Sequence, residues 1–269
     1  MKILVTGHKG FIGQNIWQHF IGSHDLIGYE WDETSLPSVK GCDAVIHLGA
    51  ISSTTERDIH KVLRQNLDFS QWLFAECARH NVILHYASSA SIYGNGLDFH
   101  ESAPPAPLSP YAWSKYLFDR WVRTQTHDNP VQGYRYFNVY GPHEDHKQDQ
   151  ASPVHKFQKQ AKEAGRIKLF EGSDTYRRDF VYVGDLCVMH EKMLAKQTSG
   201  IFNAGTGTAV SFSAVAESIA AKFDARIDLI EMPAALKSQY QEYTCADISA
   251  LLQHIDMDWT DIHNYIAGA

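Results

Sequence analysis

The sequence has no long hydrophobic run, no closely spaced cysteines and no excess of positive charge. Its four cysteines lie far apart along 269 residues, so neither a disulfide framework nor a zinc site is indicated. No stretch approaches the roughly 18 consecutive apolar residues of a membrane span. The apolar residues 3–5 near the N-terminus are too few for a signal peptide. We therefore expect a cytoplasmic protein with free thiols and no membrane partner.

The chain also lacks the charge that nucleic-acid-binding proteins carry. Its formal net charge is -7, and it has 24 Lys and Arg residues against 31 Asp and Glu. A broad basic surface is therefore not expected, and nucleic acid is an improbable partner. With 44% hydrophobic residues over this length, the chain can bury a substantial core. Any site for an anionic ligand must then be local.

A glycine-rich turn stands at the start of the chain. Residues 3–5 predict a buried parallel strand, and apolar residues from Phe11 onward recur at helical spacing. Between them, Gly7, Gly10 and Gly13 allow a sharp turn and a close approach of a pyrophosphate to the backbone amides. The helix N-terminus adds unpaired N–H groups and the positive end of its dipole. This pattern predicts a dinucleotide site; the alternative is a tight turn without a ligand.

The second predicted strand, residues 25–30, bears on the choice of cofactor. It places Glu30 about 20 residues beyond the glycine turn, where a carboxylate can accept hydrogen bonds from the adenosine ribose. The same carboxylate disfavours the 2′-phosphate of NADP, whereas the nearby Lys40 would offset that repulsion. NAD and NADP both stay open. Residues 31–41 have room only for a short connection, where an ordinary Rossmann half has a further helix and strand.

Another predicted strand, residues 43–48, ends in small and hydroxylated residues. Gly49 and Ala50 would let a cofactor pass over the strand tip. The hydroxyl-rich residues 51–55 follow at the edge where open α/β sheets bind ligands. Thr54 and Thr55 can equally cap the next helix. His47, inside the strand, is expected to be a hydrogen-bonded core histidine.

Ser89, Tyr111 and Lys115 form the predicted catalytic group. The strand at residues 82–87 delivers Ser89 to the same sheet edge, and a helix that opens at Pro110 places Tyr111 and Lys115 one turn apart on one face. An adjacent ammonium and a positively charged nicotinamide favour the phenolate of a tyrosine, whose ordinary pKa is about 10. Such a tyrosine can exchange a proton with a carbinol while hydride moves to or from the nicotinamide.

Several stretches of the chain together resemble one family. They are residues 47–56, 135–142, 146–147, 168–173 and 178–185. Over nearly its whole length the chain resembles the ADP-L-glycero-D-manno-heptose 6-epimerase family, a branch of the extended short-chain dehydrogenases/reductases. The resemblance implies an isomerase of lipopolysaccharide biosynthesis that inverts C6 of ADP-D-glycero-D-manno-heptose. The hydrogen on that carbon is not acidic, so the implied route is transient oxidation and re-reduction with a tightly bound NADP or NAD that is recycled.

The resemblance and the patterns above give the predicted site residues. Inversion needs acid/base groups on both sides of the sugar, and the resemblance implies Tyr111 on one side and Lys147 on the other. We expect no metal, although residues 143–146 are rich in potential ligands. The predicted catalytic residues are Ser89, Tyr111, Lys115 and Lys147. The predicted cofactor-binding residues are Gly7, Gly10, Phe11, Ile12, Gly13, Glu30, Trp31, Leu48, Gly49, Ala50, Ser52, Asn66, Tyr111, Lys115 and Val139. The predicted substrate-binding residues are Ser52, Ser89, Asn138, His155, Phe170, Glu171, Gly172, Ser173, Arg178 and Tyr240.

These observations predict an α/β fold, a Rossmann-like doubly wound parallel sheet with a smaller α/β substrate lobe and a cofactor half trimmed after the second strand. We predict that residues 1–141 form an NAD(P)-binding Rossmann domain, to which residues 180–205 return, and that residues 142–269 mainly form the substrate lobe. The expected partner is a nucleotide sugar, and the resemblance implies a homo-oligomer. The alternatives are another sugar-nucleotide epimerase, dehydratase or reductase of the short-chain type, and a non-catalytic dinucleotide-binding protein.

Overall fold

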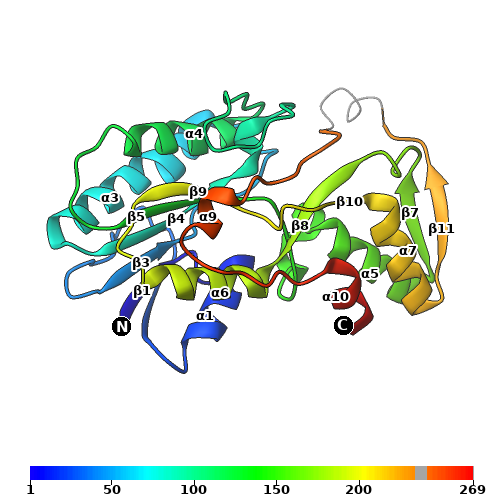
Figure 1. Ribbon diagram of the computed structural model, residues 1–269, viewed down its shortest axis with the longest axis horizontal. Coiled ribbons are helices and arrows are strands. Elements are labelled where there is room, and N and C mark those ends of the chain that lie inside the picture. Colours follow the sequence, from blue (N-terminus) through cyan, green and yellow to red (C-terminus); the bar gives the residue numbers. More distant parts are fainter. Residues whose placement is uncertain (234–240, 269) are drawn as a thin grey trace.

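The computed structural model describes residues 1–233 and 241–268, and its larger part is built on a six-stranded parallel sheet (Figure 1). The strands are β1 (Lys2–Thr6), β2 (Asp25–Tyr29), β3 (Ala44–His47), β4 (Ile83–Ser89), β5 (Val131–Tyr136) and β9 (Gly200–Ala204). Their order in the sheet is β2-β1-β3-β4-β5-β9, and every neighbouring pair is parallel.

Helices cover both faces of this sheet (Figure 1). They are α1 (Phe11–Phe20) and α6 (Val183–Leu194) on one face, and α3 (Phe69–His80) and α4 (Pro110–Val122) on the other. Side chains alternate along β1, so Ile3 and Val5 pack with Ile16 of α1, whereas Leu4 packs in the cluster that contains Phe118 of α4. Both faces of the strands are thus buried, which explains their apolar runs. The predicted doubly wound α/β fold is confirmed.

The connection between β2 and β3 is short, as the sequence predicts. Residues 30–43 form neither helix nor strand, and β2 stands at the edge of the sheet. The Tyr29 hydroxyl donates to the Ser35 carbonyl at 2.9 Å, and the Asp32 carboxylate accepts from the Thr34 amide at 2.9 Å. Local hydrogen bonds therefore hold the connection, and the cofactor half is trimmed after its second strand.

A smaller α/β lobe lies beside the large sheet (Figure 1). Its strands are β6 (Asn138–Tyr140), β7 (Arg166–Phe170), β8 (Arg177–Tyr182), β10 (Ala209–Ser211) and β11 (Arg226–Ile230), and its helices are α5 (Pro153–Ala164), α7 (Phe212–Phe223) and α10 (Ile262–Gly268). One sheet has the order β10-β8-β6, and the other pairs β11 with β7. Phe157, Ile167, Val215 and Ile219 belong to the core that these elements share.

Capping residues explain where two helices of this lobe begin. Ser211 accepts a hydrogen bond from the Ala214 amide at 3.1 Å at the start of α7. Ser152 does the same for the His155 amide at 3.2 Å at the start of α5.

The chain crosses between the two sheets in the region that we expect to return to the cofactor domain. Residues 180–182 still belong to β8, which pairs with β6 and β10, and the chain rejoins the large sheet through α6 and β9. The domain boundaries themselves stay a prediction. The short connecting helices are α2 (Ile59–Leu63), η1 (Arg64–Asp68), η2 (Ala90–Tyr93), η3 (Asp145–Gln150) and α9 (Ser249–Leu252). Among the described residues, no helix has the length and apolar character to cross a membrane.

Candidate functional site

The glycine turn leaves no space for side chains. Gly7 has a φ of 74°, in the left-handed region, and its carbonyl accepts from the Gly10 amide at 3.1 Å. A Cβ on Gly13 would lie 2.0 Å from that same carbonyl oxygen. No side chain caps the first turn of α1 at Gly10, and that turn contains no acidic residue. Its open amides and positive dipole therefore suit a diphosphate.

A cavity of about 240 Å³ opens over this turn. Glu30 lies at its rim, where one carboxylate oxygen accepts from the Lys9 amide at 2.7 Å and lies 3.1 Å from His8 Nδ1. Within the described residues, the buried indole N–H of Trp31 has no hydrogen-bond partner. That donor and the glycine turn fit a nucleotide. The predicted residues that line this cavity are Gly7, Gly10, Phe11, Ile12, Gly13, Glu30, Trp31, Leu48, Gly49, Ala50, Ser52 and Lys147.

A second cavity, of about 320 Å³, lies at the carboxyl edge of the large sheet. Predicted residues among its lining are Phe11, Ile12, Leu48, Ser52, Ser89, Tyr111, Lys115, Asn138, Val139 and Lys147. The two cavities share Phe11, Ile12, Leu48, Ser52 and Lys147. A ligand that extends from the glycine turn over the tip of β3 would therefore reach Ser89 and Tyr111.

Helix α4 supplies two of the polar groups in the second cavity. Ser109 caps the helix through the Ala112 amide at 3.1 Å, and Pro110 occupies its first turn. The Lys115 ammonium donates to the Ala87 carbonyl at 2.8 Å and lies 5.9 Å from the centre of the Tyr111 ring. The structure thus brings Tyr111 and Lys115 onto one helix face, as their spacing predicts.

Burial dominates the ionisation of these groups. It raises the pKa of Tyr111 above its usual value, and a hydrogen bond with Ser89 opposes the shift. It lowers the pKa of Lys115 to about 8, and the nearby Asp119 carboxylate opposes that shift. At neutral pH the site therefore presents a tyrosine hydroxyl beside a lysine that is still charged. The sequence argument expects the ammonium and a bound nicotinamide together to favour the phenolate. In the protein without a ligand, burial holds the pKa of the phenol above its usual value.

Lys147 approaches the cavities from η3. Its ammonium lies 4.9 Å from the centre of the Phe11 ring, at the start of α1. Burial lowers the pKa of Lys147, Glu144 opposes that shift, and Lys156 adds to it. The second cavity is therefore lined by the Tyr111 hydroxyl from α4 and the Lys147 amine from η3.

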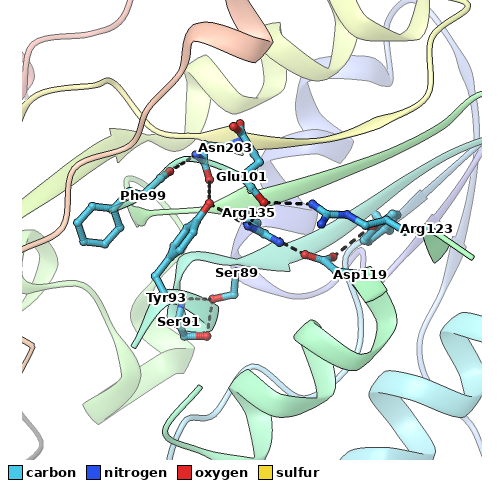
Figure 2. Close-up of polar contacts among 10 residues, drawn as sticks. Ser89, Ser91, Tyr93, Phe99, Glu101, Asp119, Arg123, Arg135 and Asn203 are labelled. Carbon is cyan, nitrogen blue, oxygen red and sulfur yellow. Dashed lines mark hydrogen bonds and ion pairs between the residues drawn. The ribbon is translucent and has the colours of Figure 1, made fainter. Parts of the chain in front are cut away.

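A buried polar network extends from α4 into the core (Figure 2). Arg135 Nε donates to Asp119 at 2.9 Å, and its Nη1 donates to the Tyr93 hydroxyl at 3.0 Å. Tyr93 in turn donates to Asn203 Oδ1 at 2.6 Å, and the backbone N–H of Asn203 donates to Glu101 Oε1 at 2.7 Å. The sequence argument missed this network because charged residues in an amphipathic helix are ordinarily exposed.

Asn66, predicted to bind the cofactor, lies behind the loop after β3, and its role stays a prediction. Its Oδ1 accepts from the Ile51 amide at 2.9 Å, and its Nδ2 donates to the Ile51 carbonyl at 2.9 Å and to Ser114 Oγ at 3.0 Å. These bonds use both amide protons and an oxygen lone pair of its side chain. Asn66 therefore supports the loop after β3 from behind and does not line either cavity.

Several predicted substrate residues lie away from both cavities. Arg178 Nη1 donates to the Arg177 carbonyl at 2.9 Å, and Nη2 donates to the Gln241 carbonyl. His155 lies near Asp145 on the outside of α5, at 3.6 Å. Tyr240 lies outside the described residues. The roles of these residues stay predictions, as do those of Phe170, Glu171, Gly172 and Ser173, none of which lines either cavity.

Other residues line the cavities without having been singled out. The first cavity includes Gln65, Phe69 and His146. The second includes Tyr136 and Gln150. Tyr136 lies in the stretch 135–142 that carries the family resemblance, and that stretch could have pointed to it, whereas no sequence signal marks Gln150. His146 precedes Lys147 and could have been found by its place beside that residue. Within residues 1–233 and 241–268, no three His, Cys, Asp or Glu side chains gather in a metal-binding arrangement.

Comparison with known proteins places the chain among sugar-nucleotide enzymes. The model of the NAD dependent epimerase/dehydratase family matches residues 3–205. A relative from Alkalilimnicola ehrlichii, named ADP-L-glycero-D-manno-heptose-6-epimerase, is 38% identical and aligns with 98% of this chain and 96% of its own. The alignment spans 309 positions, more than the 269 residues here. That relative therefore carries segments that this chain lacks.

Solved structures agree with the sequence comparison. The ADP-L-glycero-D-manno-heptose-6-epimerase of Helicobacter pylori matches with a TM-score of 0.88 and 26% identity, over 99% of this chain and 94% of that chain. The UDP-glucose 4-epimerase of Thermus thermophilus, solved in complex with NAD, matches with a TM-score of 0.78 and 26% identity, over 94% of this chain and 93% of that chain.

Proposed function

The chain belongs to the NAD dependent epimerase/dehydratase family, and we propose that it inverts C6 of ADP-D-glycero-D-manno-heptose without net oxidation. The relative that is 38% identical over nearly the full length carries that activity in its name. One observation carries the proposal: Ser89, Tyr111 and Lys147 line one cavity, and this cavity shares five lining residues with the cavity over the glycine turn. This arrangement places acid/base groups where a sugar bound beside the cofactor would meet them.

The residues of the first cavity would hold the dinucleotide. The glycine turn and the amides of α1 would bind its diphosphate, and Glu30 would accept from the adenosine ribose. When bound, NAD supplies the hydride acceptor that makes oxidation at a non-acidic carbon possible. We propose NAD as the cofactor, tightly bound and recycled within each turnover. NADP stays the alternative because His8, a basic side chain, lies 3.1 Å from the Glu30 carboxylate.

Tyr111 and Ser89 would act on the oxygen at C6. Burial keeps Tyr111 protonated at neutral pH, so its hydroxyl can donate to a ketone oxygen as the alcohol is re-formed. The Lys115 ammonium, one helical turn away, would stabilise the phenolate that results. Ser89 hydrogen-bonds Tyr111 and would contact the same sugar oxygen.

Lys147 would serve the other orientation of the sugar. Inversion requires that hydride return to the face opposite the one it left, and a ketone turned over in the cavity presents its oxygen to a different acid. Lys147 lines the same cavity as Tyr111 and comes from a separate element. Burial lowers the pKa of Lys147 below its usual value, a shift in the direction that suits an amine that gives and takes a proton.

The proposal extends to partners and location. A nucleotide sugar would be the small-molecule substrate, and the protein would work in the cytoplasm. The family resemblance implies a homo-oligomer. Light scattering on the purified protein would give its mass in solution.

The decisive experiment supplies ADP-D-glycero-D-manno-heptose and follows the configuration at C6 by proton NMR. We expect conversion to an equilibrium mixture without added reductant, lost in Tyr111→Phe and in Lys147→Ala. Retained activity in Lys147→Ala would favour a related sugar-nucleotide enzyme that does not need two acid/base groups. Absence of conversion by protein that binds NAD would reject this substrate. If other sugar nucleotides also fail to turn over, the non-catalytic dinucleotide-binding protein becomes the better description.

A further inference from the structure

Glu144 is a buried carboxylate that the chemistry proposed above does not use. Its exposed fraction is 0%, and it lies three residues before Lys147. Its Oε1 accepts from the Gly141 amide at 3.2 Å and from Ser152 Oγ at 2.7 Å, and its Oε2 accepts from the Ser152 amide at 2.5 Å. One carboxylate therefore joins the two ends of the loop formed by residues 141–152.

The backbone of this loop needs such support. His143 and Gln148 have φ values of 71° and 46°, in the left-handed region that residues other than glycine rarely adopt. They stand on either side of Lys147, whose amide donates to the Glu144 carbonyl at 2.9 Å. Conformations of this kind persist only where the surrounding structure fixes them, and they gather at functional sites.

Further contacts tie the loop to the helices on its two sides. Asn15 of α1 donates to the Pro142 carbonyl at 3.0 Å, and Lys156 of α5 donates to the Asp149 carbonyl at 2.7 Å. The charged groups that act on the Lys147 ammonium are Glu144 of the same loop and Lys156 of α5. The amine therefore depends on the loop for its position and has one nearby carboxylate as its counter-charge.

We propose that Glu144 is a positioning residue for Lys147. It closes the 141–152 loop so that the Lys147 ammonium stays over the Phe11 ring, at 4.9 Å, at the boundary between the two cavities. The inference rests on the proposed function, since Lys147 would act on the sugar there. Glu144 itself lines neither cavity, so it would act on the sugar through Lys147.

The kinetic test measures C6 inversion by Glu144→Gln. The NH₂ group of glutamine is a donor and would face one of the Ser152 donors. The hydrogen bonds that close the 141–152 loop are then broken, while the side-chain volume is kept. We expect kcat to fall roughly 10²-fold, the scale of one acid/base group, with KM changed much less. Ser152→Ala removes one donor to the carboxylate and should give a smaller loss. Glu144→Asp, which keeps the charge, should recover part of kcat.

A double variant separates positioning from general destabilisation. If Glu144 acts through Lys147, then Glu144→Gln placed in a Lys147→Ala background should cost nothing more than Lys147→Ala alone. If the two losses multiply instead, Glu144 supports the fold in general and the proposal is overturned. Far-ultraviolet circular dichroism of each variant shows whether it is folded.

A second readout does not depend on the substrate. The acetylation rate of Lys147 by an N-hydroxysuccinimide ester, followed by peptide mass spectrometry, reports how well the loop covers the amine. We expect a several-fold faster rate in Glu144→Gln and no change in Asp145→Asn, the matched control. Asp145 is the next residue of the loop, and its side chain is 91% exposed.

The two readouts fail differently. If wild-type protein does not turn over ADP-heptose but Glu144→Gln speeds acetylation of Lys147, the proposed function is rejected and the positioning role stands. An unchanged acetylation rate in folded Glu144→Gln would overturn the positioning role whatever the substrate is.

Discussion

Lys115 holds its charge at neutral pH by a narrow margin, because burial lowers its pKa to about 8 and only Asp119 opposes the shift. We predict that kcat falls as pH rises through about 8, approaching tenfold per pH unit above it, because the ammonium that stabilises the Tyr111 phenolate is lost. Kinetics of C6 inversion between pH 6 and pH 10 would measure this fall in kcat. In Asp119→Asn the fall in kcat should begin at lower pH. A fall at the same pH in both proteins would contradict its assignment to Lys115.

At this scale the sequence predicts the groups whose placement follows from local geometry. Tyr111 and Lys115 meet because residues four apart share a helix face, and Ser89 joins them because parallel strands end at one edge. Glu144 and Asp119 could not be predicted. Their roles depend on burial, and burial depends on which distant groups, such as Arg135, fold against them.

The π-helical segment η1 shows how an element sets the position of a loop. Asn66 extends from it to both backbone groups of Ile51 and to Ser114 of α4. It therefore fixes the loop after β3, which lines both cavities, against the helix that carries Tyr111. Helical irregularities of this type are frequently found at functional sites.

We predict that Asn66→Ala lowers the free energy of unfolding by roughly 2 to 4 kcal/mol, because backbone groups of Ile51 lose their buried partners. Urea unfolding would measure this loss. The affinity for NAD, measured by calorimetry, should fall as well, since the loop lines the cofactor cavity. Arg64→Ala is the control on the same element: its side chain is 53% exposed, so the change should be about 0.5 kcal/mol or less. Equal losses in the two variants would contradict the role assigned to Asn66.

Among the elements, the large sheet was predictable and the position of β8 was not. Apolar runs mark β1, β3 and β4, and the short length of residues 31–41 predicts the trimmed connection. Residues 177–182 begin with three charged residues, and only Phe180, Val181 and Tyr182 are as apolar as a strand of the large sheet. Their pairing with β6 and β10 depends on contacts between distant segments, which periodicity does not encode.

At the scale of the whole molecule, one buried carboxylate links the two sheets. Asp179, in β8 of the smaller sheet, accepts from the Thr206 and Gly207 amides beyond β9 at 2.8 and 2.9 Å. It also accepts from the Ala246 amide at 3.0 Å. Segments from both parts of the chain therefore converge on a single side chain, which ties the smaller lobe to the end of the large sheet.

Buried histidines connect the layers of the large sheet. His190 of α6 lies 2.6 Å from the Tyr136 hydroxyl, and its Nδ1 lies 2.9 Å from Nδ1 of His85 in β4. His47, in β3, hydrogen-bonds Thr6 at 2.6 Å and Ser70 at 2.8 Å, as expected of a core histidine. Burial lowers the pKa of His47 and of His190 to about 3, and it lowers that of His85 well below its usual value.

These histidines predict that acid destabilises the whole fold. Above pH 6.5 these histidines are neutral in both the folded and the unfolded chain. Between pH 6.5 and about pH 3 they are protonated in the unfolded chain and stay neutral in the folded chain. Stability is therefore lost as pH falls from 6.5, by roughly 2 kcal/mol per histidine at pH 5. Urea unfolding at several pH values would measure the slope. His190→Asn should reduce the slope of the unfolding free energy against pH by up to about 1.4 kcal/mol per pH unit. The exposed control His60→Asn should leave that slope unchanged. Equal slopes in the wild-type protein and both variants would refute the assignment.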